Sequence, residues 1–461
     1  MTWPNELELD LTAIAQGGDA VGHDPEGRAV FANGGLPGER VRVRLHSRQK
    51  RWAKGTVTAV LRAAPERISS PCPLESVCGA ADWRWVDHAA QVRWKQQVLR
   101  EQLQHLGGLA VDDLVIGTIT PPDAAQAWNY RTTVELHAAP DTLGYYAPHS
   151  RRSHDVPTCC LHHPLINDAL LALRRLLPHD PPFSSLTLRC APSTEQVLAI
   201  FGGEAWENTE EEDEEWSSPS SDSSVGWENR APTGGDERPR PDDLVALARQ
   251  WQRTFPALVG VVSEVGRTPT TLVGRPWLVH EVAGLQFQVS AEAFFQINAH
   301  ATELLVDRVT ALVALKPHER LLDVFCGVGT FTLPLARRAT AVVGIESWPA
   351  AIADARQSAK ANGITNAEWH IGTAETVLPQ LAGPWDAVLL DPPRRGCEPP
   401  LLDALLALRP ARIVYVSCHP GTLARDCKHL ATGGYRVAHA EVIDLFPQTH
   451  HVESIVRLEL A

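Results

Sequence analysis

The chain of 461 residues is 44% apolar and 21% charged, a balance typical of globular proteins, and its length predicts roughly two to four domains. It has no run of about 18 consecutive apolar residues, which excludes a transmembrane helix. The start of the chain carries acids and lacks the apolar region of a secretory signal. Nine cysteines without such a signal favour a reducing cytosol, where thiols serve as ligands, nucleophiles or core residues. We therefore expect a cytoplasmic protein.

The formal net charge of −13 is concentrated in one segment. Residues 204–243 contain 14 acids and 3 arginines, a net charge of −11, so the rest of the chain carries −2. Between residues 38 and 67 the sign reverses, with nine Lys and Arg residues against Glu39 and Glu66. Local charge steers polyanions, so this basic stretch is compatible with nucleic-acid binding despite the acidic total.

Residues 1–62 predict a small β-barrel. Short strand patterns at 6–14, 29–32, 40–45 and 55–61 are separated by glycine-rich turns, which is typical of OB-type barrels that bind single-stranded nucleic acid. Alternation with apolar residues puts three arginines on one strand face, and the basic character continues into the next loop. A solvated strand face would give the same pattern. We predict RNA contacts at Arg40, Arg42, Arg44, Lys50, Arg51 and Lys54.

Residues 63–275 predict a mixed α+β domain, with a helix at 88–106 and a strand at 130–137. Within it, residues 204–243 are rich in Glu, Ser, Pro and Gly and have no apolar periodicity. Such a composition cannot offset the entropy lost on ordering, so we expect a disordered insertion. Trp206, Trp216 and Trp227 offer anchors for a partner, although a plain linker is the simpler interpretation.

Strand and helix patterns alternate through residues 276–461, which predicts an α/β domain. Five βα units followed by a hairpin indicate a doubly wound, Rossmann-like sheet with an antiparallel strand near one edge. The expected strands are 320–324, 341–346, 367–371, 387–390, 412–416, 436–443 and 452–458.

The first of these strands runs into a glycine turn that opens a helix, which predicts a nucleoside site. Gly327 and Gly329 allow close approach of the backbone, and Glu346, at the end of the next strand, can accept hydrogen bonds from ribose hydroxyls. The turn lacks the third glycine of dinucleotide-binding proteins and the lysine of a P-loop. S-adenosylmethionine (AdoMet) therefore fits better than NAD or ATP, the alternative being a glycine turn beside a surface glutamate.

The fourth strand ends in Asp391, followed by two prolines that stiffen a loop at the ligand-binding edge of the sheet. Methyltransferases that act on amino groups of adenine or cytosine place an aromatic residue after such prolines, and RNA 5-methylcytosine enzymes place a cysteine there. This chain has Arg394. The loop therefore argues against both of these reactions.

Cys418 follows the fifth strand and predicts a nucleophile at the same edge. A thiol, a few per cent ionised at neutral pH, suits attack on an electron-poor pyrimidine. Neighbouring His419 is a candidate to assist it. Glu453 starts the last strand and is a candidate general base, because the preceding loop lies at the same edge. The alternatives are a buried structural thiol and a surface glutamate.

In these motifs the chain resembles the AdoMet-dependent RNA 5-methyluridine methyltransferases, in particular the 23S rRNA type with a TRAM domain. The matching segments, in the same order, are 294–298, 323–330, 391–396, 417–426 and 446–453. The resemblance implies that residues 1–62 form a TRAM domain ahead of a central RNA-binding domain and a methyltransferase domain.

The same resemblance implies roles for individual residues. Cys418 would add to carbon 6 of uridine, the resulting enolate would take the methyl group at carbon 5, and Glu453 would accept the carbon 5 proton. Arg131 would face RNA, although Thr132 and Thr133 stand where the family has Asn and Lys, and His419 replaces an Asn. The residues expected to contact AdoMet are Gln296, Phe325, Gly327, Glu346 and Asp391.

Several members of this family hold a [4Fe–4S] cluster on a Cys-x5-Cys-x2-Cys segment and one distant cysteine. Cys72 and Cys78 keep the first spacing, but Ala81 occupies the third position, and Cys159 aligns with the distant ligand beside Cys160. Four thiolates are the usual requirement, so we expect the cluster to be absent or labile. Metal ligation by Cys72, Cys78 and Cys159 with His162 or His163 is the rival interpretation.

Two other functions compete with uridine methylation: methylation of another base, and a non-catalytic RNA-binding role for an AdoMet fold. Arg394 and the Cys418–Glu453 pairing argue against the first, and retention of Cys418, Glu453 and Gln296 argues against the second. The expected partner is RNA, with 23S rRNA favoured over tRNA by the barrel. We expect a monomer without membrane association.

Overall fold

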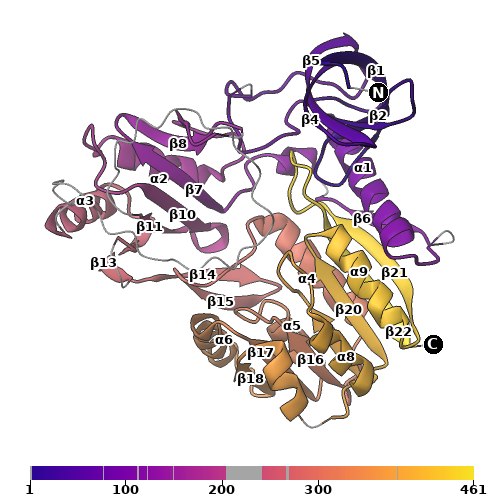
Figure 1. The fold of residues 1–461 in the computed structure, drawn as a ribbon. Helices are drawn as coiled ribbons and strands as arrows, with labels where there is room; N and C mark the ends of the chain where they lie inside the picture. Colours follow the sequence, from indigo (N-terminus) through magenta and orange to yellow (C-terminus); the bar gives the residue numbers. More distant parts are fainter. Residues whose placement is uncertain are drawn as a thin grey trace, which may run out of the picture.

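The computed structural model describes residues 3–75, 77–111, 114–121, 123–148, 150–203, 241–265, 269–381 and 383–460 (Figure 1). Most of the predicted insertion, residues 204–240 with Trp206, Trp216 and Trp227, lies outside the described residues. Among the helices of the described ranges, none combines the length and the apolar character that a membrane span requires.

The N-terminal strands close into a barrel in the order β1-β2-β3-β5-β4, which confirms the OB-like barrel. Apolar residues alternate inward along β4, where Val41, Val43 and Leu45 are buried between exposed arginines. Strand β2 was absent from the sequence prediction because four residues that include Gly22 give too short a pattern. The barrel strands are β1 (Glu6–Ile14), β2 (Ala20–His23), β3 (Ala29–Asn33), β4 (Arg40–Arg48) and β5 (Trp52–Arg62).

The central part of the chain forms a seven-stranded sheet in the order β13-β12-β11-β10-β7-β8-β9, covered by two helices. The rings of Phe183 and Phe201 stack with their centroids 4.5 Å apart, and the Trp251 ring of α3 stacks on Phe201 in the same core. Residues 241–243 form the first turn of α3. The elements are β7 (Thr133–Ala139), β8 (Thr142–Tyr146), β9 (Ser153–Asp155), α2 (Pro164–Arg174), β10 (Ser185–Ala191), η3 (Pro192–Thr194), β11 (Gln196–Gly202), α3 (Pro241–Thr254), β12 (Leu258–Ser263) and β13 (Thr270–Gly274).

The C-terminal part contains an eight-stranded sheet in the order β18-β17-β16-β19-β20-β22-β21-β6, preceded by the hairpin β14–β15. Its first five strands are parallel, and β22 runs antiparallel between β20 and β21. This confirms the doubly wound methyltransferase fold. The strands are β14 (Trp277–Val282), β15 (Leu285–Ser290), β16 (Arg320–Val324), β17 (Ala341–Glu346), β18 (Ala367–Ile371), β19 (Ala387–Leu390), β20 (Arg412–Ser417), β21 (Tyr435–Ile443) and β22 (Glu453–Leu460). The helices are α4 (Ala299–Val313), α5 (Thr332–Ala336), α6 (Pro349–Ala361), α7 (Ala374–Val377), η4 (Leu378–Gln380), α8 (Pro399–Leu408) and α9 (Pro420–Ala431).

A segment that follows the barrel joins this C-terminal sheet. Helix α1 (His88–Glu101) continues into the π-helical turn η1 (Gln102–Leu106), and β6 (Ile116–Ile119) then pairs in parallel with β21 before the short turn η2 (Ala124–Ala127). In Figure 1, β6 lies beside β21 although more than 300 residues separate them. One apolar core runs from Leu11 of the barrel through Trp94 of α1 to Tyr415 of β20. The barrel is therefore packed onto the sheet rather than tethered to it.

A buried charge cluster ties α1 to the loop between β21 and β22. The ammonium group of Lys95, 1% exposed, donates to Asp444 Oδ1 at 2.7 Å and to the Phe446 carbonyl at 2.8 Å, and His88 Nε2 lies 2.6 Å from Asp444 Oδ2. Burial alone would raise the pKa of Asp444, but the charges and hydrogen bonds of Lys95 and His88 lower it below its usual value of 3.8. The stabilisation is therefore fully present above about pH 4 and is lost as the pH falls through the lowered pKa.

We predict that Lys95→Met lowers the free energy of unfolding by about 3–5 kcal/mol, because it leaves the Asp444 carboxylate buried without its ammonium partner. Urea denaturation at pH 7 measures this change. Lys360→Met, on an exposed position of α6, is the matched control and should change the stability by less than about 0.5 kcal/mol. Equal stabilities of the two variants would contradict the structural role of Lys95.

Candidate active site

The carboxyl edge of the sheet gathers the chemically reactive residues of the C-terminal domain. Asp323 lies in β16, Glu346 ends β17, Asp391 follows β19, and Cys418 follows β20. The parallel register aligns Val324 with Leu390, so the ends of β16 and β19 lie side by side. Ligands of open α/β sheets bind at this edge.

The pairing of β20 and β22 brings Cys418 and Glu453 to the same place. These antiparallel strands pair Ser417 with Ser454 as the last pair of their ladder, and Cys418 and Glu453 each adjoin that pair in the chain. The Ser454 hydroxyl donates to the Ser417 carbonyl at 3.1 Å and ties the two strand ends together. The two groups are close enough for the charge of Glu453 to act on the Cys418 thiol. A thiol and a carboxyl group therefore share the same side of the catalytic edge.

The pKa values of both groups are raised by burial and by neighbouring acids. Burial, followed by the charge of Glu453, raises the pKa of Cys418 to about 11. Burial, followed by the charge of Asp391, raises the pKa of Glu453 well above its ordinary value. The charge of Arg394 opposes both shifts. A ligand that adds positive charge here would make the thiolate and the carboxylate easier to form.

The glycine turn after β16 is held against the end of β17. Glu346 accepts the amide of Gly327 at 3.1 Å and, through its other oxygen, the amide of Trp348 at 2.9 Å. Phe325 has a φ of +68°, a backbone conformation that residues other than glycine rarely adopt. Gly329 has a φ of +85°, and a Cβ built on it would lie 2.9 Å from the Trp369 ring. The close packing explains the glycine at position 329.

Asp323 has an unused hydrogen-bonding atom. Its Oδ2 accepts the Thr332 hydroxyl at 2.5 Å, while Oδ1 is buried and has no partner among the described residues. Burial raises the pKa of Asp323 to about 7, with a further contribution from Glu346. Burial, Asp323 and Glu346 likewise raise the pKa of Asp391 to about 7. These three carboxyl groups form a site that favours a cationic ligand.

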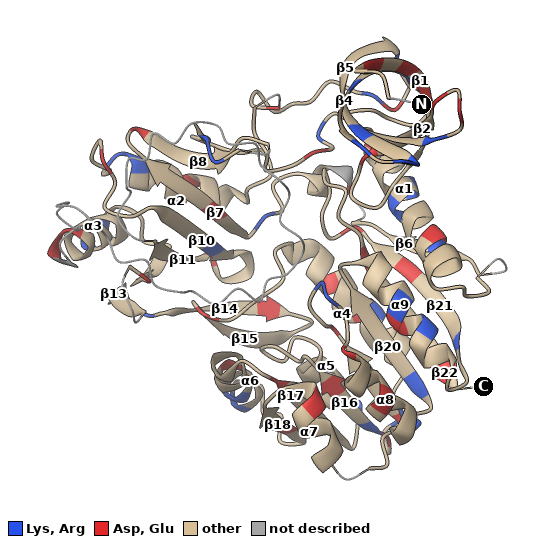
Figure 2. Ribbon diagram, viewed as in Figure 1, with Lys and Arg blue, Asp and Glu red and all other residues tan. Residues whose placement is uncertain are grey.

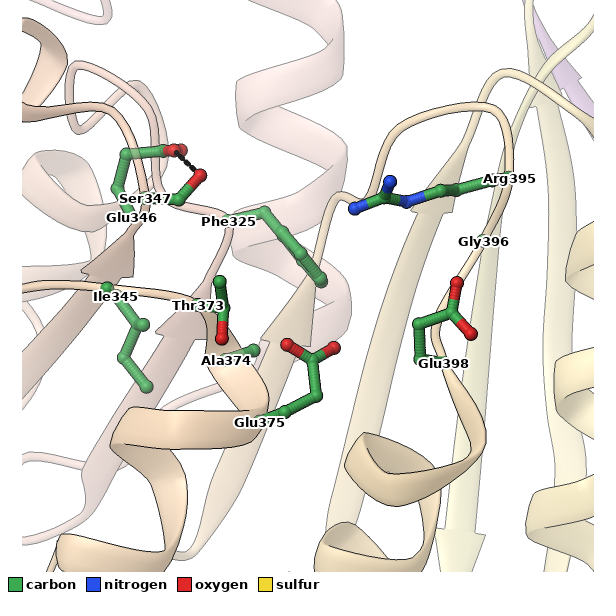
Figure 3. A pocket seen from close by; sticks show the side chains of 11 residues that line it. Phe325, Ile345, Glu346, Ser347, Thr373, Ala374, Glu375, Arg395, Gly396 and Glu398 are labelled. Carbon is green, nitrogen blue, oxygen red and sulfur yellow. Dashed lines mark hydrogen bonds between the residues drawn. The ribbon is translucent and has the colours of Figure 1, made fainter. Parts of the chain in front are cut away.

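A cleft with about 420 Å³ of unfilled space, part of it open to solvent, adjoins the glycine turn. Phe325, Ile345 and Glu346 line one side, and Figure 3 shows the side chains of Glu375, on helix α7, and Arg395, on the loop after β19, approaching it. Of the expected cofactor residues, Phe325 and Glu346 line this cleft, whereas Gln296, Gly327 and Asp391 are outside its lining.

The sequence motifs did not point to the cleft residues that follow β17, β18 and β19. They are Ser347, Gly372, Thr373, Ala374, Glu375, Arg395, Gly396 and Glu398. The signal was available, because Gly372 and Thr373 stand between a predicted strand and the next helix, at the edge where ligands bind. Gln296 lies between β15 and α4, half-buried, and its side chain has no hydrogen bond to any residue of the described ranges.

His419 takes over the local role that an asparagine would have. Its Nδ1 accepts the Thr422 amide at 3.2 Å and caps the N-terminus of α9. Burial, and then the charges of Arg394 and Arg425, lowers the pKa of His419, so the ring is neutral near pH 7. The replacement of Asn by His therefore preserves the helix cap behind Cys418.

Comparisons with known proteins show the family of this chain. The sequence model described as tRNA (Uracil-5-)-methyltransferase matches residues 279–461. An uncharacterized RNA methyltransferase of Gloeobacter violaceus is 34% identical over 98% of this chain and 96% of its own. The 23S rRNA (uracil(1939)-C(5))-methyltransferase RlmD of Alkalilimnicola ehrlichii is 32% identical over 97% of this chain and 95% of its own. The chain belongs to the RNA (uracil-5-)-methyltransferase family.

The fold of this methyltransferase also has a solved counterpart. The Pyrococcus abyssi tRNA (uracil-54, C5)-methyltransferase, crystallised with S-adenosyl-L-homocysteine, superposes with a TM-score of 0.71. The two chains are 21% identical, and the match covers 98% of this chain and 99% of the other. At this identity the comparison supports the three-part fold.

The arginine face of the barrel carries compensating acids. Arg40, Arg42 and Arg44 of β4 form ion pairs with Asp10, Glu8 and Glu6 of the neighbouring strand β1, and Figure 2 shows the two charges side by side on the barrel. Lys50, Arg51 and Lys54 are exposed and form no ion pair within the described part of the chain. RNA contact at all six positions remains a prediction, and Lys50, Arg51 and Lys54 are the three whose charge no ion pair compensates within the described residues.

Arg131 is held by the protein rather than fully presented to solvent. Its guanidinium group donates to the Ala80 carbonyl at 2.8 Å, and its backbone bridges to His162 and Asn298. Burial lowers its pKa, but the neighbouring Tyr130 and Tyr145 raise it by more, so the charge is retained. Its contact with RNA also remains a prediction.

The residues of the cluster-like segment do not fit a [4Fe–4S] group. Cys159 lies in a small buried cluster with Ala81, which supplies a methyl group where a fourth thiolate would be needed. Cys160 keeps its proton and hydrogen-bonds Cys159, which lowers the pKa of Cys159 and raises that of Cys160. Within the described ranges, no group of three or more His, Cys, Asp or Glu side chains is arranged to hold a metal ion.

We predict that the purified protein contains no stoichiometric iron, because the segment supplies too few correctly placed thiolates. Elemental analysis for iron and acid-labile sulfide, together with the absorbance near 400 nm, measures this. Anaerobic purification is the control for loss of a labile cluster. About four iron atoms per chain after anaerobic purification would overturn the prediction.

We predict that alkylation of Cys418 accelerates about tenfold per pH unit between pH 7 and 9, because the thiolate is the reactive form and its pKa is about 11. Removing the Arg394 charge with Arg394→Met should slow the reaction about three- to tenfold at pH 8. Lys428→Met, an exposed position on the following helix α9, is the control. Site-resolved mass spectrometry after iodoacetamide treatment measures the rate, and a pH-independent rate would contradict the prediction.

Proposed function

We propose that this methyltransferase transfers the methyl group of AdoMet to carbon 5 of a specific uridine in RNA through a covalent bond between Cys418 and carbon 6. The observation that carries the proposal is the pairing of Ser417 with Ser454, which brings the adjoining Cys418 and Glu453 together at the ligand-binding edge. Methylation of uracil carbon 5 needs both a nucleophile for the ring and a base for the carbon 5 proton.

The residues of the glycine turn suit AdoMet. We propose that Phe325 and the adjoining cleft hold the adenosine, and that Gly327, Glu346 and Gln296 contribute polar contacts. The unpartnered Oδ1 of Asp323 and the carboxyl group of Asp391 suit a ligand that carries positive charge. When bound, AdoMet supplies an electrophilic methyl group on a sulfonium.

Cys418 starts the reaction. Its thiolate adds to carbon 6 of uracil, and the electrons of the 5,6 double bond pass to the carbonyl at carbon 4, which gives an enolate with nucleophilic carbon 5. The positive charge of Arg394 favours the thiolate over the thiol. After carbon 5 has been methylated, it carries both the new methyl group and its original proton.

Glu453 completes the reaction as the base. Its carboxylate removes the proton from carbon 5, the 5,6 double bond re-forms, and the bond from carbon 6 to sulfur breaks to release the Cys418 thiolate. Burial and the charge of Asp391 raise the pKa of Glu453, whereas the charge of Arg394 lowers it. Positive charge brought by the ligand would therefore help to convert Glu453 into a base.

We propose 23S rRNA as the substrate, with tRNA as the alternative to be tested. The 23S rRNA enzyme RlmD is similar over nearly the whole chain, including the N-terminal barrel. We assign residues 1–62 to a TRAM domain, 63–275 to a central RNA-binding domain and 276–461 to the methyltransferase domain. The target base must leave its stack, at a cost of a few kcal/mol, and contacts of Arg131 and the barrel cations with phosphates would offset that cost. We propose that the enzyme acts as a cytoplasmic monomer.

We predict that Glu453→Gln transfers the methyl group but cannot remove the carbon 5 proton, so that a covalent RNA–protein adduct accumulates. Cys418→Ala should form no adduct and lose at least about 10³-fold in rate, since nucleophilic catalysis is abolished. Denaturing gel electrophoresis with labelled RNA measures the adduct, and transfer from radiolabelled AdoMet measures the methylation.

Glu459→Gln, six residues along the same strand, is the control for Glu453→Gln and should neither trap RNA nor slow turnover. Methylation by Cys418→Ala at the wild-type rate would refute the covalent mechanism. Mapping 5-methyluridine in rRNA and tRNA from a deletion strain identifies the substrate, and loss of the modification from tRNA alone would refute the 23S rRNA assignment.

A further inference from the structure

The turn between β1 and β2 reaches from the barrel to the catalytic edge of the methyltransferase sheet. Two backbone hydrogen bonds close it, from Ala15 N to the Asp19 carbonyl at 2.9 Å and from Gly18 N to the Ala15 carbonyl at 3.1 Å. At its tip, the amide nitrogen Nε2 of Gln16 lies 2.7 Å from Nε2 of His419, the residue that follows Cys418. More than 400 residues of chain separate these contacting groups.

The turn touches both loops that flank the reactive pair. A Cβ on Gly421, at the start of α9, would lie 2.9 Å from the Gln16 amide oxygen. A Cβ on Gly18 would lie 2.6 Å from the Cβ of His450, in the loop that leads to Glu453. In Figure 1 this loop extends from the sheet towards the barrel. The turn is therefore packed tightly between the Cys418 loop and the Glu453 loop.

The protonation of the His419 ring decides whether Gln16 must supply a hydrogen-bond donor or an acceptor. A neutral imidazole has one accepting and one donating nitrogen, and Nδ1 accepts the Thr422 amide. Nε2 must therefore carry the proton and donate it. In the structure the amide nitrogen of Gln16 faces Nε2, so two donors would meet there. Turning the amide by 180° replaces that nitrogen with the amide oxygen, which is the matching acceptor. With both nitrogens engaged, the ring is fixed, and so is the backbone that connects it to Cys418.

We propose that Gln16 is a positioning residue for Cys418: the barrel turn holds the His419 ring and thereby keeps the nucleophile loop in its reactive conformation. The inference rests on the proposed role of Cys418 as the nucleophile. Gln16 is half-buried and its amide is engaged by His419, whereas Lys50 and Arg51 are exposed in a different loop of the barrel. In this proposal the exposed cations of the barrel contact RNA, whereas the turn that carries Gln16 affects the chemical step.

The first test replaces the acceptor of Gln16 at nearly constant volume. Gln16→Met should lower the single-turnover rate of methyl transfer to an unmodified 23S rRNA transcript about tenfold, while the dissociation constant for that RNA changes less than about twofold. Gln16→Glu keeps an oxygen acceptor and should restore the rate to within about threefold of wild type. A merely structural contact would give no such rescue.

Three results would overturn the proposal. They are an unchanged rate in Gln16→Met, a loss explained entirely by weaker RNA binding, and a Gln16→Glu variant as slow as Gln16→Met. Failure of the proposed function is recognised separately, because it would show in the wild-type enzyme as methyl transfer without a covalent adduct in 5-fluorouridine RNA.

A second test uses the two glycines of the turn as a matched pair. Gly17 and Gly18 both have positive φ, +100° and +88°, so alanine strains the backbone similarly at either position. Only at Gly18 does the new methyl group meet another residue, since nothing lies within 4 Å of a Cβ at Gly17. Gly18→Ala should therefore slow methyl transfer at least about fivefold relative to Gly17→Ala at equal RNA affinity. Equal rates for the two variants would refute the role of the turn.

Discussion

Strand β22 runs antiparallel between β20 and β21, and the active site depends on this pairing. It brings Glu453 near Cys418 and connects their strand ends through the hydrogen bond of Ser454. In a fully parallel sheet the start of the last strand would lie at the opposite edge, about as far away as a strand is long. The hairpin therefore supplies the sheet with a carboxyl group that parallel topology alone would not place beside the thiol.

The raised pKa values of the site result from the burial of several acidic groups close to one another. Asp323, Glu346 and Asp391 lie near one another, and burial together with mutual repulsion raises the pKa of Asp323 and of Asp391 to about 7. Burial and neighbouring acids also raise the pKa values of Cys418 and Glu453. A positively charged ligand at this site would lower the pKa values of these groups. A sulfonium cofactor has such a charge, so its binding would favour the thiolate and the carboxylate.

The three parts of the chain are joined by packing as well as by sequence. The core that begins in the barrel continues through α1 into the methyltransferase sheet, and Lys95 and Asp444 add a buried ion pair between α1 and the loop before Glu453. Strand β6 extends the same sheet. With the Gln16–His419 contact, these links bring the N-terminal barrel and the loops that carry Cys418 and Glu453 into one continuous structure.

The sequence by itself determined the elements and their chemistry. Apolar periodicity located β16, β17, β18 and β19 at their observed bounds, because buried parallel strands between helices leave a strong pattern. The motifs also identified the nucleophile candidate, the acid candidates and the glycine turn. Short or weakly patterned elements such as β2 and β6 escaped prediction, since four residues carry little periodicity.

Only the tertiary structure decided which distant residues meet. It paired the barrel arginines with Glu6, Glu8 and Asp10, which the alternating pattern could not foretell, because cross-strand partners depend on register. It also placed Gln16 on His419, Lys95 on Asp444 and Glu375 in the cleft. These contacts join segments up to about 400 residues apart. Local sequence patterns cannot predict them, because each contact arises from how complete domains pack together.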